Sequence, residues 1–167
     1  EVVEVNVPEI RLVFITNDGL VQTFDAETGA MLWSSPCGRV SAPAHPGAVS
    51  SAGVSLIHGR NLYLLDWKTG KQWMNKELKS GASVALAVCN DLAYISDFRG
   101  HLQAYGLGVT HKLWSSQIIG RAVGQPVSLA DQSFCAIAST DGYVYTLTAG
   151  ENPDIWTRYE TTSAISG

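Results

Sequence analysis

The stretch GLVQTFDAETGAMLW, residues 19–33, decides the fold, because its first and last residues recur along the chain at a fixed distance. Four tryptophans follow one another at almost equal intervals: Trp33, Trp73, Trp114 and Trp156. A glycine precedes each of them, and the distance from glycine to tryptophan is the same in all four cases: Gly19, Gly59, Gly100 and Gly142. A unit of about forty residues that occurs four times in step indicates a tandem-repeat architecture.

The glycine of each copy marks a tight turn between two apolar runs. The residue before it is polar in every copy: Asp18, His58, Arg99 and Asp141. A polar residue followed by glycine between apolar runs is typical of a β-hairpin, and the glycine supplies the positive φ that such a turn requires. No stretch has the sustained helical spacing of apolar residues, so we expect very little helix.

Each copy divides into four short strands with short loops between them, as an antiparallel meander requires. We predict strands at residues 2–7, 10–16, 20–25 and 30–35 in copy one, and at 44–50, 54–58, 62–66 and 71–75 in copy two. A single meander cannot bury both its faces, but copies stacked around an axis bury them. The sequence therefore predicts an all-β propeller of four consecutive four-stranded antiparallel blades. The predicted domain covers 1–167, with repeats at about 1–40, 41–81, 82–122 and 123–167.

The regularly spaced tryptophans fit a role in the core, because a Trp side chain buries a large apolar area and its ring N–H needs only one acceptor. We interpret Trp33, Trp73, Trp114 and Trp156 as structural residues. Trp67 lies outside this register, next to the turn at Thr69 and Gly70, and we expect it to be exposed.

The segment TFDAETGAMLW, residues 23–33, resembles the repeat of quinoprotein dehydrogenases and their relatives, which reads Ala-x-Asp-x-x-Thr-Gly-x-x-x-Trp. Copy one has Thr23 in place of the alanine, and copy two is one residue shorter before its Trp. Copies three and four keep the tryptophan and lose the aspartate. The chain is thus similar to propellers of the pyrroloquinoline-quinone-repeat type, and the resemblance implies that the four tryptophans lock neighbouring blades together.

This family contains enzymes that hold the quinone at the propeller axis. It also contains non-catalytic proteins, such as the periplasmic lipoprotein of outer-membrane β-barrel assembly and lumenal sensor domains. The resemblance alone favours a periplasmic or extracytoplasmic location, and the sequence itself leaves the compartment open. A fold of this kind does not choose between catalysis and scaffolding.

Quinone-dependent catalysis needs parts that this sequence does not offer. By the family resemblance, such an enzyme has a vicinal Cys-Cys pair, a calcium ion and an aspartate base. Cys37, Cys89 and Cys135 are far apart, and we interpret them as partly buried free thiols. Asp25 and Asp66 lie in repeat turns, where a carboxylate accepts backbone N–H bonds. We therefore expect a non-catalytic protein without a cofactor or a metal site.

Nucleophilic catalysis has no better support. His58 and His101 adjoin hairpin glycines, and we interpret them as exposed turn residues rather than general bases. The sequence also has no G-x-S-x-G elbow.

With 46% apolar and 16% charged residues and a net charge of −4, the chain has no basic stripe for nucleic acid. No apolar run approaches the length that spans a bilayer.

The weak candidates for ligand binding are Arg39 and Arg121, each of which directly follows a glycine at a copy boundary. In stacked repeats they would take similar places on two blades, where a guanidinium could hold an anion. A non-catalytic scaffold for protein–protein interaction or assembly is the leading hypothesis. A propeller that binds a small ligand or acts as a sensor is the alternative, and a fragment of a quinone-dependent dehydrogenase is less favoured.

The number of copies raises the question of ring closure. Families of this repeat type close with seven or eight blades, so four blades predict half of an eight-bladed ring. The end blades would then each expose an apolar face. A second copy could complete the ring as a homodimer, or a longer chain could supply the missing blades. Because the four repeats are almost equal in length, which leaves no room for an altered blade geometry, we disfavour closure with four blades.

Overall fold

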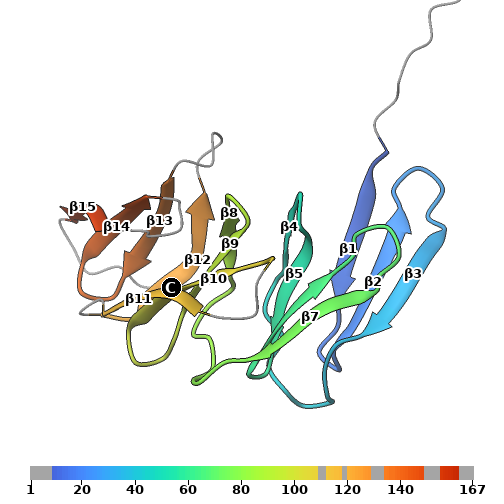
Figure 1. Ribbon diagram of the computed structural model, residues 1–167, viewed down its shortest axis with the longest axis horizontal. Coiled ribbons are helices and arrows are strands. Elements are labelled where there is room, and N and C mark those ends of the chain that lie inside the picture. The colour runs from blue at the N-terminus through green and yellow to red at the C-terminus, as the bar shows by residue number, and fades with distance from the viewer. Residues whose placement is uncertain (1–8, 109–111, 118–119, 129–133, 149–154, 162–167) are drawn as a thin grey trace, which may run out of the picture.

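The computed structural model describes residues 9–108, 112–117, 120–128, 134–148 and 155–161, and within these ranges it has strands but no helix. The strands form four antiparallel sheets that stand side by side in chain order, from blue to red in Figure 1. This arrangement confirms the predicted propeller of consecutive blades, which we number 1 to 4 along the chain. The predicted strand at 2–7 lies outside the described residues.

Each blade is a meander in which consecutive strands are hydrogen-bonded neighbours. Blade 1 has β1 (Arg11–Ile15), β2 (Leu20–Asp25) and β3 (Met31–Pro36). Blade 2 has β4 (Ala48–Ser50), β5 (Gly53–His58), β6 (Asn61–Leu65) and β7 (Gln72–Glu77). Blade 3 has β8 (Ala87–Cys89), β9 (Leu92–Ser96), β10 (His101–Gly106) and β11 (Lys112–Gln117). Blade 4 has β12 (Ala122–Ser128), β13 (Phe134–Ser139), β14 (Tyr143–Thr148) and β15 (Ile155–Glu160).

The innermost strands of neighbouring blades contact one another, β4 with β8 and β8 with β12. Strand β4 is shorter than the predicted 44–50, and only a single bridge from Ala44 to His58 extends it. All four glycines of the hairpin turns take a positive φ, as the turn chemistry predicts: Gly19, Gly59, Gly100 and Gly142.

The core lies between the blades rather than inside them. Successive residues of a strand point to opposite faces, so each blade gives one set of side chains to the blade before it and one to the blade after it. Every residue of β5 and β9 is buried, because these strands have a blade on both sides. The apolar cluster between blades 1 and 2 is built around Val21, Trp33 and Leu56.

The predicted role of Trp73 is wrong, because the strand register gives that role to Met74. In blade 1 Trp33 is paired across the sheet, and Leu32 is the extra residue where the register shifts. In blade 2 Met74 is paired and Trp73 is the extra residue. Trp73 is 55% exposed, whereas Met74 is 6% exposed.

A tighter hairpin in blade 2 explains this shift. His58 pairs directly with Asn61, so Gly59 lies two residues before the strand that follows it, whereas the other hairpin glycines lie one residue before theirs. The fixed distance counted from Gly59 therefore reaches Trp73, which lies one residue before the paired position at Met74. A slip of one residue turns a side chain to the opposite face of a sheet.

The backbone register also places the other two tryptophans, Trp114 and Trp156, at different positions of their blades. Trp114 pairs with Ala104 and so takes the position of Trp33. In blade 4 Thr157 takes that position and Trp156 is the extra residue. The side chains of Trp114 and Trp156 lie outside the described part of the chain, and their structural role stays a prediction.

His58 is buried at 2% exposure, which corrects the interpretation of it as an exposed turn residue. Because it pairs with Asn61, it is the last residue of a strand rather than part of the turn. Its ring lies against Gly38, where an added Cβ would collide with Nδ1. Nε2 lies 3.3 Å from the carbonyl oxygen of Asn17 in blade 1.

Candidate interaction site

Two turns with the sequence pattern Asp-x-x-Thr-Gly connect strands in the first two blades, at 25–29 between β2 and β3 and at 66–70 between β6 and β7. In the first turn, Oδ1 of Asp25 accepts a hydrogen bond from the amide of Glu27 at 3.1 Å. The same oxygen accepts bonds from the amide and the hydroxyl of Thr28, both at 2.7 Å. A carboxylate that bonds its own backbone closes such a turn without help from the rest of the fold.

The second turn repeats this arrangement. Oδ1 of Asp66 accepts a bond from the Lys68 amide at 3.1 Å, and from the amide and hydroxyl of Thr69 at 2.7 Å. The hydroxyl bonds from Thr28 and Thr69 are the main cause that lowers the pKa of Asp25 and Asp66. Both carboxylates therefore accept hydrogen bonds from within their own turns, as the sequence predicts.

Trp33 of blade 1 docks onto the second turn. Its ring N–H donates a hydrogen bond to the backbone oxygen of Trp67 at 3.0 Å, and the side chain is 8% exposed. A Cβ built at Gly70 would collide with the Trp33 ring, so only glycine allows the ring to lie on the turn. The structure thus confirms that Trp33 locks two neighbouring blades together.

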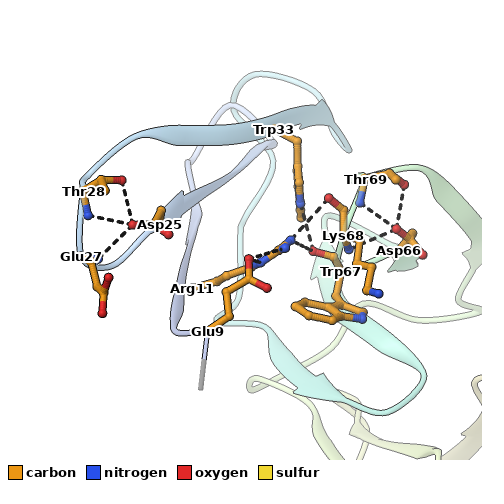
Figure 2. A network of polar contacts seen from close by, with 10 residues as sticks. All are labelled: Glu9, Arg11, Asp25, Glu27, Thr28, Trp33, Asp66, Trp67, Lys68 and Thr69. Atoms are coloured by element: carbon orange, nitrogen blue, oxygen red, sulfur yellow. Dashed lines mark hydrogen bonds and ion pairs between the residues drawn. The ribbon is translucent and has the colours of Figure 1, made fainter. Parts of the chain in front are cut away.

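Arg11 strengthens the same junction, as Figure 2 shows. Its guanidinium donates to the backbone oxygens of Trp67 at 3.0 Å and Lys68 at 3.4 Å, and stacks 4.4 Å from the centre of the Trp67 ring. Glu9 accepts two further bonds from the same group, at 2.6 and 2.8 Å. Trp67 is therefore half-buried, which corrects the expectation that it is exposed.

The turn at 25–29 has no side chain docked on it in the part of the chain that the structure describes. Gly29 has a φ of +69° and Gly70 has a φ of +70°, so the two backbones match. A Cβ built at Gly29 would meet no atom within 4 Å, whereas at Gly70 it would collide with Trp33. The first turn is therefore an open copy of the surface that receives a tryptophan in blade 2.

The face of blade 1 beside this open turn is apolar and exposed. Leu12 is 46% exposed, Phe14 is 52% exposed and Met31 is 57% exposed. Phe14 packs edge-on against Phe24, with 5.6 Å between the ring centres. In the strand register Leu12, Phe14 and Phe24 correspond to three residues of blade 2 that are buried under blade 1: Val54, Leu56 and Leu65. We call Leu12, Phe14, Phe24 and Met31 the outer face of blade 1.

The structure places the two candidate arginines in separate hollows. Arg39 is exposed and lines a groove of about 700 Å³, together with Arg60, Tyr63 and the buried His58. Arg60 donates to the backbone oxygens of Leu78 and Lys79 at 3.1 and 2.9 Å. Glu77 also lines the groove and pairs with Arg60 at 3.7 Å, and anion binding at Arg39 stays a prediction.

Arg121 lines a different hollow, of about 340 Å³, whose walls include Val84, Phe98 and Val123. Its amide donates to Oγ1 of Thr140 at 3.0 Å, and its carbonyl oxygen accepts the Thr140 amide at 2.9 Å. These two bonds fix the backbone of Arg121 to the hairpin turn of blade 4. The structure does not bring Arg39 and Arg121 together at one site.

Asp97 is a buried acid that the sequence reasoning missed. It is 2% exposed and accepts hydrogen bonds from the hydroxyl of Ser80 at 2.5 Å and the amides of Arg99 and His101, both at 2.9 Å. Its Oδ2 also lies 3.2 Å from Nδ1 of His101, which is consequently only partly exposed and not a free turn residue. Gln103 adds a bond at 3.3 Å.

A comparison of the sequence copies could have pointed to Asp97. The position three residues before the hairpin glycine is Thr16, Asp97 or Ser139 in copies one, three and four, and all three side chains can accept a hydrogen bond. Burial acts to raise the pKa of Asp97, but the bonds from Ser80, His101 and Arg99 outweigh it, and the pKa lies below its usual value. The Asp97 carboxylate is thus an anchor for its turn.

The three cysteines are buried thiols, and none of them forms a disulfide. Burial raises the pKa of Cys135 to about 12, and it also raises the pKa of Cys37, so neither is a ready nucleophile.

Within the described ranges, no group of three or more His, Cys, Asp or Glu side chains is placed to hold a metal ion. No helix in this part of the chain is long and apolar enough to cross a membrane.

Comparison with known families shows which family the chain belongs to. The sequence matches the family described as "Outer membrane protein assembly factor BamB" over residues 17–158, which is most of the chain. The chain belongs to this BamB family. Among curated proteins, none matches the sequence.

Solved propellers share the fold. The crystal structure of BamB from Moraxella catarrhalis is 21% identical and superposes with a TM-score of 0.66, over 88% of this chain and 46% of that one. The computationally designed Ika8 protein is 14% identical, with a TM-score of 0.77 over 95% of this chain and 49% of its own. The C-terminal WD40 domain of Sif2 is 12% identical, with a TM-score of 0.68 over 91% and 45%. The chain thus spans about half the length of the structures that it matches.

Proposed function

We propose that this chain is a non-catalytic β-propeller scaffold for protein–protein interaction or assembly. The observation that carries the proposal is the open turn at 25–29 beside the exposed outer face of blade 1. Membership of the BamB family supports an assembly role of this kind. An exposed apolar face next to a vacant docking turn is the form that an interaction surface takes.

The partner at this surface is a further propeller blade that carries a tryptophan at the position of Trp33. The molecule contains the template, because Trp33 already covers the matching turn of blade 2. Blade 4 has Thr157 at that position, so a second copy of this chain would bring no tryptophan there through its blade 4. The register therefore favours additional blades over a homodimer as the natural completion of the ring.

Self-association tests whether the outer face of blade 1 binds protein surfaces. When no other blade is present, the apolar face should drive the chains together. We expect sedimentation equilibrium to give masses that rise above 17.9 kDa with concentration. Phe14→Ser should return the mass to that of one chain, because it removes the largest exposed aromatic of the face.

Val40→Ser is the matched control, since Val40 is 76% exposed but lies outside the outer face of blade 1. This variant should associate as the unchanged chain does. A well-behaved species of 17.9 kDa at every concentration would count against the proposal and for a small closed ring.

The groove beside Arg39 favours a second candidate function, the binding of a small anionic ligand. Citrate is a suitable probe, because its carboxylates match the guanidinium donors of Arg39. We expect citrate to raise the melting temperature of the chain, and Arg39→Gln to remove that rise. Equal stabilisation of both proteins would exclude Arg39 as the ligand-binding residue.

A further inference from the structure

Phe98 is a large aromatic side chain at the tip of the hairpin turn between β9 and β10, and it is 61% exposed. Its ring lies against Gly81, where an added Cβ would be 3.6 Å away. The same turn position holds polar residues in copies one and four, Asn17 and Thr140. Blade 3 is thus distinguished by an aromatic group that its neighbours do not have.

The turn that carries Phe98 is fixed by hydrogen bonds to the buried Asp97. The buried Asp97 carboxylate accepts bonds from two amides of the turn and from the hydroxyl of Ser80 in the preceding loop. The backbone adds a bond from the Asp97 amide to the His101 oxygen at 3.0 Å, and one from the Gly100 amide to the Asp97 oxygen at 3.1 Å. Because the turn is already ordered, a contact made by Phe98 loses little conformational entropy.

Phe98 forms one wall of the 340 Å³ hollow between blades 3 and 4. Val84 and Val123 add apolar surface, and Arg121 supplies a positive charge whose backbone is fixed by Thr140. We call Val84, Phe98, Arg121 and Val123 the Phe98 surface. Aromatic residues such as Phe and the side chain of arginine are both enriched at protein interfaces.

The charge around the Phe98 surface is positive. Lys79 and Arg99 line a second hollow, of about 240 Å³, next to Phe98 along the turn, together with His101 and Asp97. Asp97 lies beneath this hollow but is almost fully buried. The other nearby acid, Asp141, accepts the hydroxyl of Tyr145 at 2.6 Å and keeps its negative charge, so the three cations Lys79, Arg99 and Arg121 outnumber the two carboxylates by one. A basic rim on a chain of net charge −4 is a local feature that selects an acidic partner.

We propose that the Phe98 surface binds a peptide segment of a partner protein, one that places an apolar side chain in the hollow and carboxylates beside the arginines. This inference rests on the proposed scaffold function and names a second surface with its own partner chemistry. It uses none of the residues of the outer face of blade 1, so the two surfaces can be tested separately.

Selection from a displayed library of random twelve-residue peptides tests this proposal. The bait is the whole chain, and the selected peptides are then measured by fluorescence anisotropy against single variants. We expect the enriched peptides to share an apolar residue flanked by Asp or Glu. Phe98→Ser should weaken their binding at least tenfold, Arg121→Gln severalfold, and 0.5 M salt should weaken binding to the unchanged chain.

Two controls make the outcomes distinct. Val40→Ser should bind the peptides as the unchanged chain does, because Val40 is exposed but belongs to neither surface. Peptides whose binding is lost in Phe14→Ser and kept in Phe98→Ser would overturn this inference and leave the scaffold proposal standing. Enriched peptides without acidic residues would also overturn it.

Anionic membranes are the competing source of negative charge. Vesicles of phosphatidylglycerol and phosphatidylcholine serve as the probe, in a co-sedimentation assay. If the chain yields no Phe98-dependent peptide and instead binds these vesicles through Phe98, the peptide assignment is overturned in favour of a lipid surface. Peptide binding that depends on Phe98, without vesicle binding, supports the proposal.

Discussion

The turn at 25–29 and the turn at 66–70 have the same sequence pattern, the same three carboxylate bonds and almost the same glycine φ. Only the second has a tryptophan docked on it among the residues that the structure describes. The turn conformation therefore does not depend on docking, because each aspartate closes its own turn. A turn that is already in its docked shape loses little ordering entropy when a blade arrives.

The two faces beside these turns extend the comparison. Leu12 pairs with Phe24 in blade 1 as Val54 pairs with Leu65 in blade 2, so the positions correspond. Val54 is 1% exposed and Leu12 is 46% exposed. The two exposed fractions differ because of the neighbouring blade and not because of the strand itself, since blade 1 covers this face of blade 2. The outer face of blade 1 is exposed because no blade covers it among the residues that the structure describes.

The largest expected effect separates Trp33 from Trp73. Trp33→Ala should lower the free energy of unfolding by about 3–5 kcal/mol, since it empties a buried site between two blades and removes a hydrogen bond. Trp73→Ala should change it by less than about 0.5 kcal/mol, because that ring is mostly in water. Urea unfolding followed by circular dichroism measures both.

Met74→Ala is the control for this register. It should cost about 2–5 kcal/mol, as for other buried side chains truncated to alanine. A loss at Trp73 equal to that at Trp33 would show that the sheet register of blade 2 is different from the one described.

The next effect compares the two turn glycines. Gly70→Ala should destabilise the chain by about 2–4 kcal/mol, because a Cβ there collides with Trp33 and the backbone is left-handed. Gly29→Ala should cost about 1–2 kcal/mol, since it carries only the backbone strain. Differential scanning calorimetry on both variants checks the order. Equal losses would contradict the docking of Trp33 on Gly70.

A smaller effect compares two carboxylates that both close turns, one buried and one exposed. Asp97→Asn should lower the free energy of unfolding at pH 7 by about 1–3 kcal/mol, because the charged hydrogen bonds are lost. Asp25→Asn should have a smaller effect, since water surrounds that turn.

The pH dependence has a definite sign. The pKa of Asp97 lies below its ordinary value of 3.8 in the folded chain, so its stabilisation is complete above about pH 4. It is lost as the pH falls through the folded pKa. Unfolding curves from pH 7 down to pH 3 should therefore show a shallower loss of stability below pH 4 in Asp97→Asn. Identical pH profiles would exclude the buried carboxylate as the anchor.

The smallest effect is a rate of chemical labelling. Cys37, Cys89 and Cys135 are buried thiols, and a raised pKa leaves little thiolate at Cys37 and Cys135. Dithionitrobenzoate at pH 8 should label them only as fast as the chain opens, and all three should react in 6 M guanidinium. Rapid labelling of one thiol in the native chain would locate a part of the fold that opens on its own.

Repetition made most of the fold predictable. The pattern at 23–33 identified the turn and the strands beside it, because these are local consequences of Asp, Thr and Gly at fixed spacing. The docking role of Trp33 was implied by the resemblance to the quinoprotein repeat. The prediction failed at Trp73, where distance was counted from a hairpin glycine whose turn is one residue tighter. Trp33 follows Asp25 at the same distance as Met74 follows Asp66, so counting from the aspartate would have found the right residue.

Residues that act across blades were harder to find. Arg11 contacts Trp67 from 56 positions away, and nothing in the repeat marks it. Phe98 stands out only once the hairpin turns are aligned. The burial of His58 depends on the pairing of one strand end, which spacing alone does not determine. Local turn chemistry is thus visible in a sequence, whereas contacts between blades need the register.

The most direct test of the open turn adds a blade in front of it. A fusion that repeats residues 9–50 ahead of residue 9 keeps the two-residue spacing found between β4 and β5, and it supplies a tryptophan at the position of Trp33. Ala26→Cys reports on the turn through its rate of labelling by dithionitrobenzoate. We expect the fusion to slow this labelling at least tenfold, and the same fusion with its added tryptophan changed to alanine to restore most of the rate. Equal labelling in the unfused chain, the fusion and its alanine control would contradict the claim that the turn at 25–29 is a vacant site for a neighbouring blade.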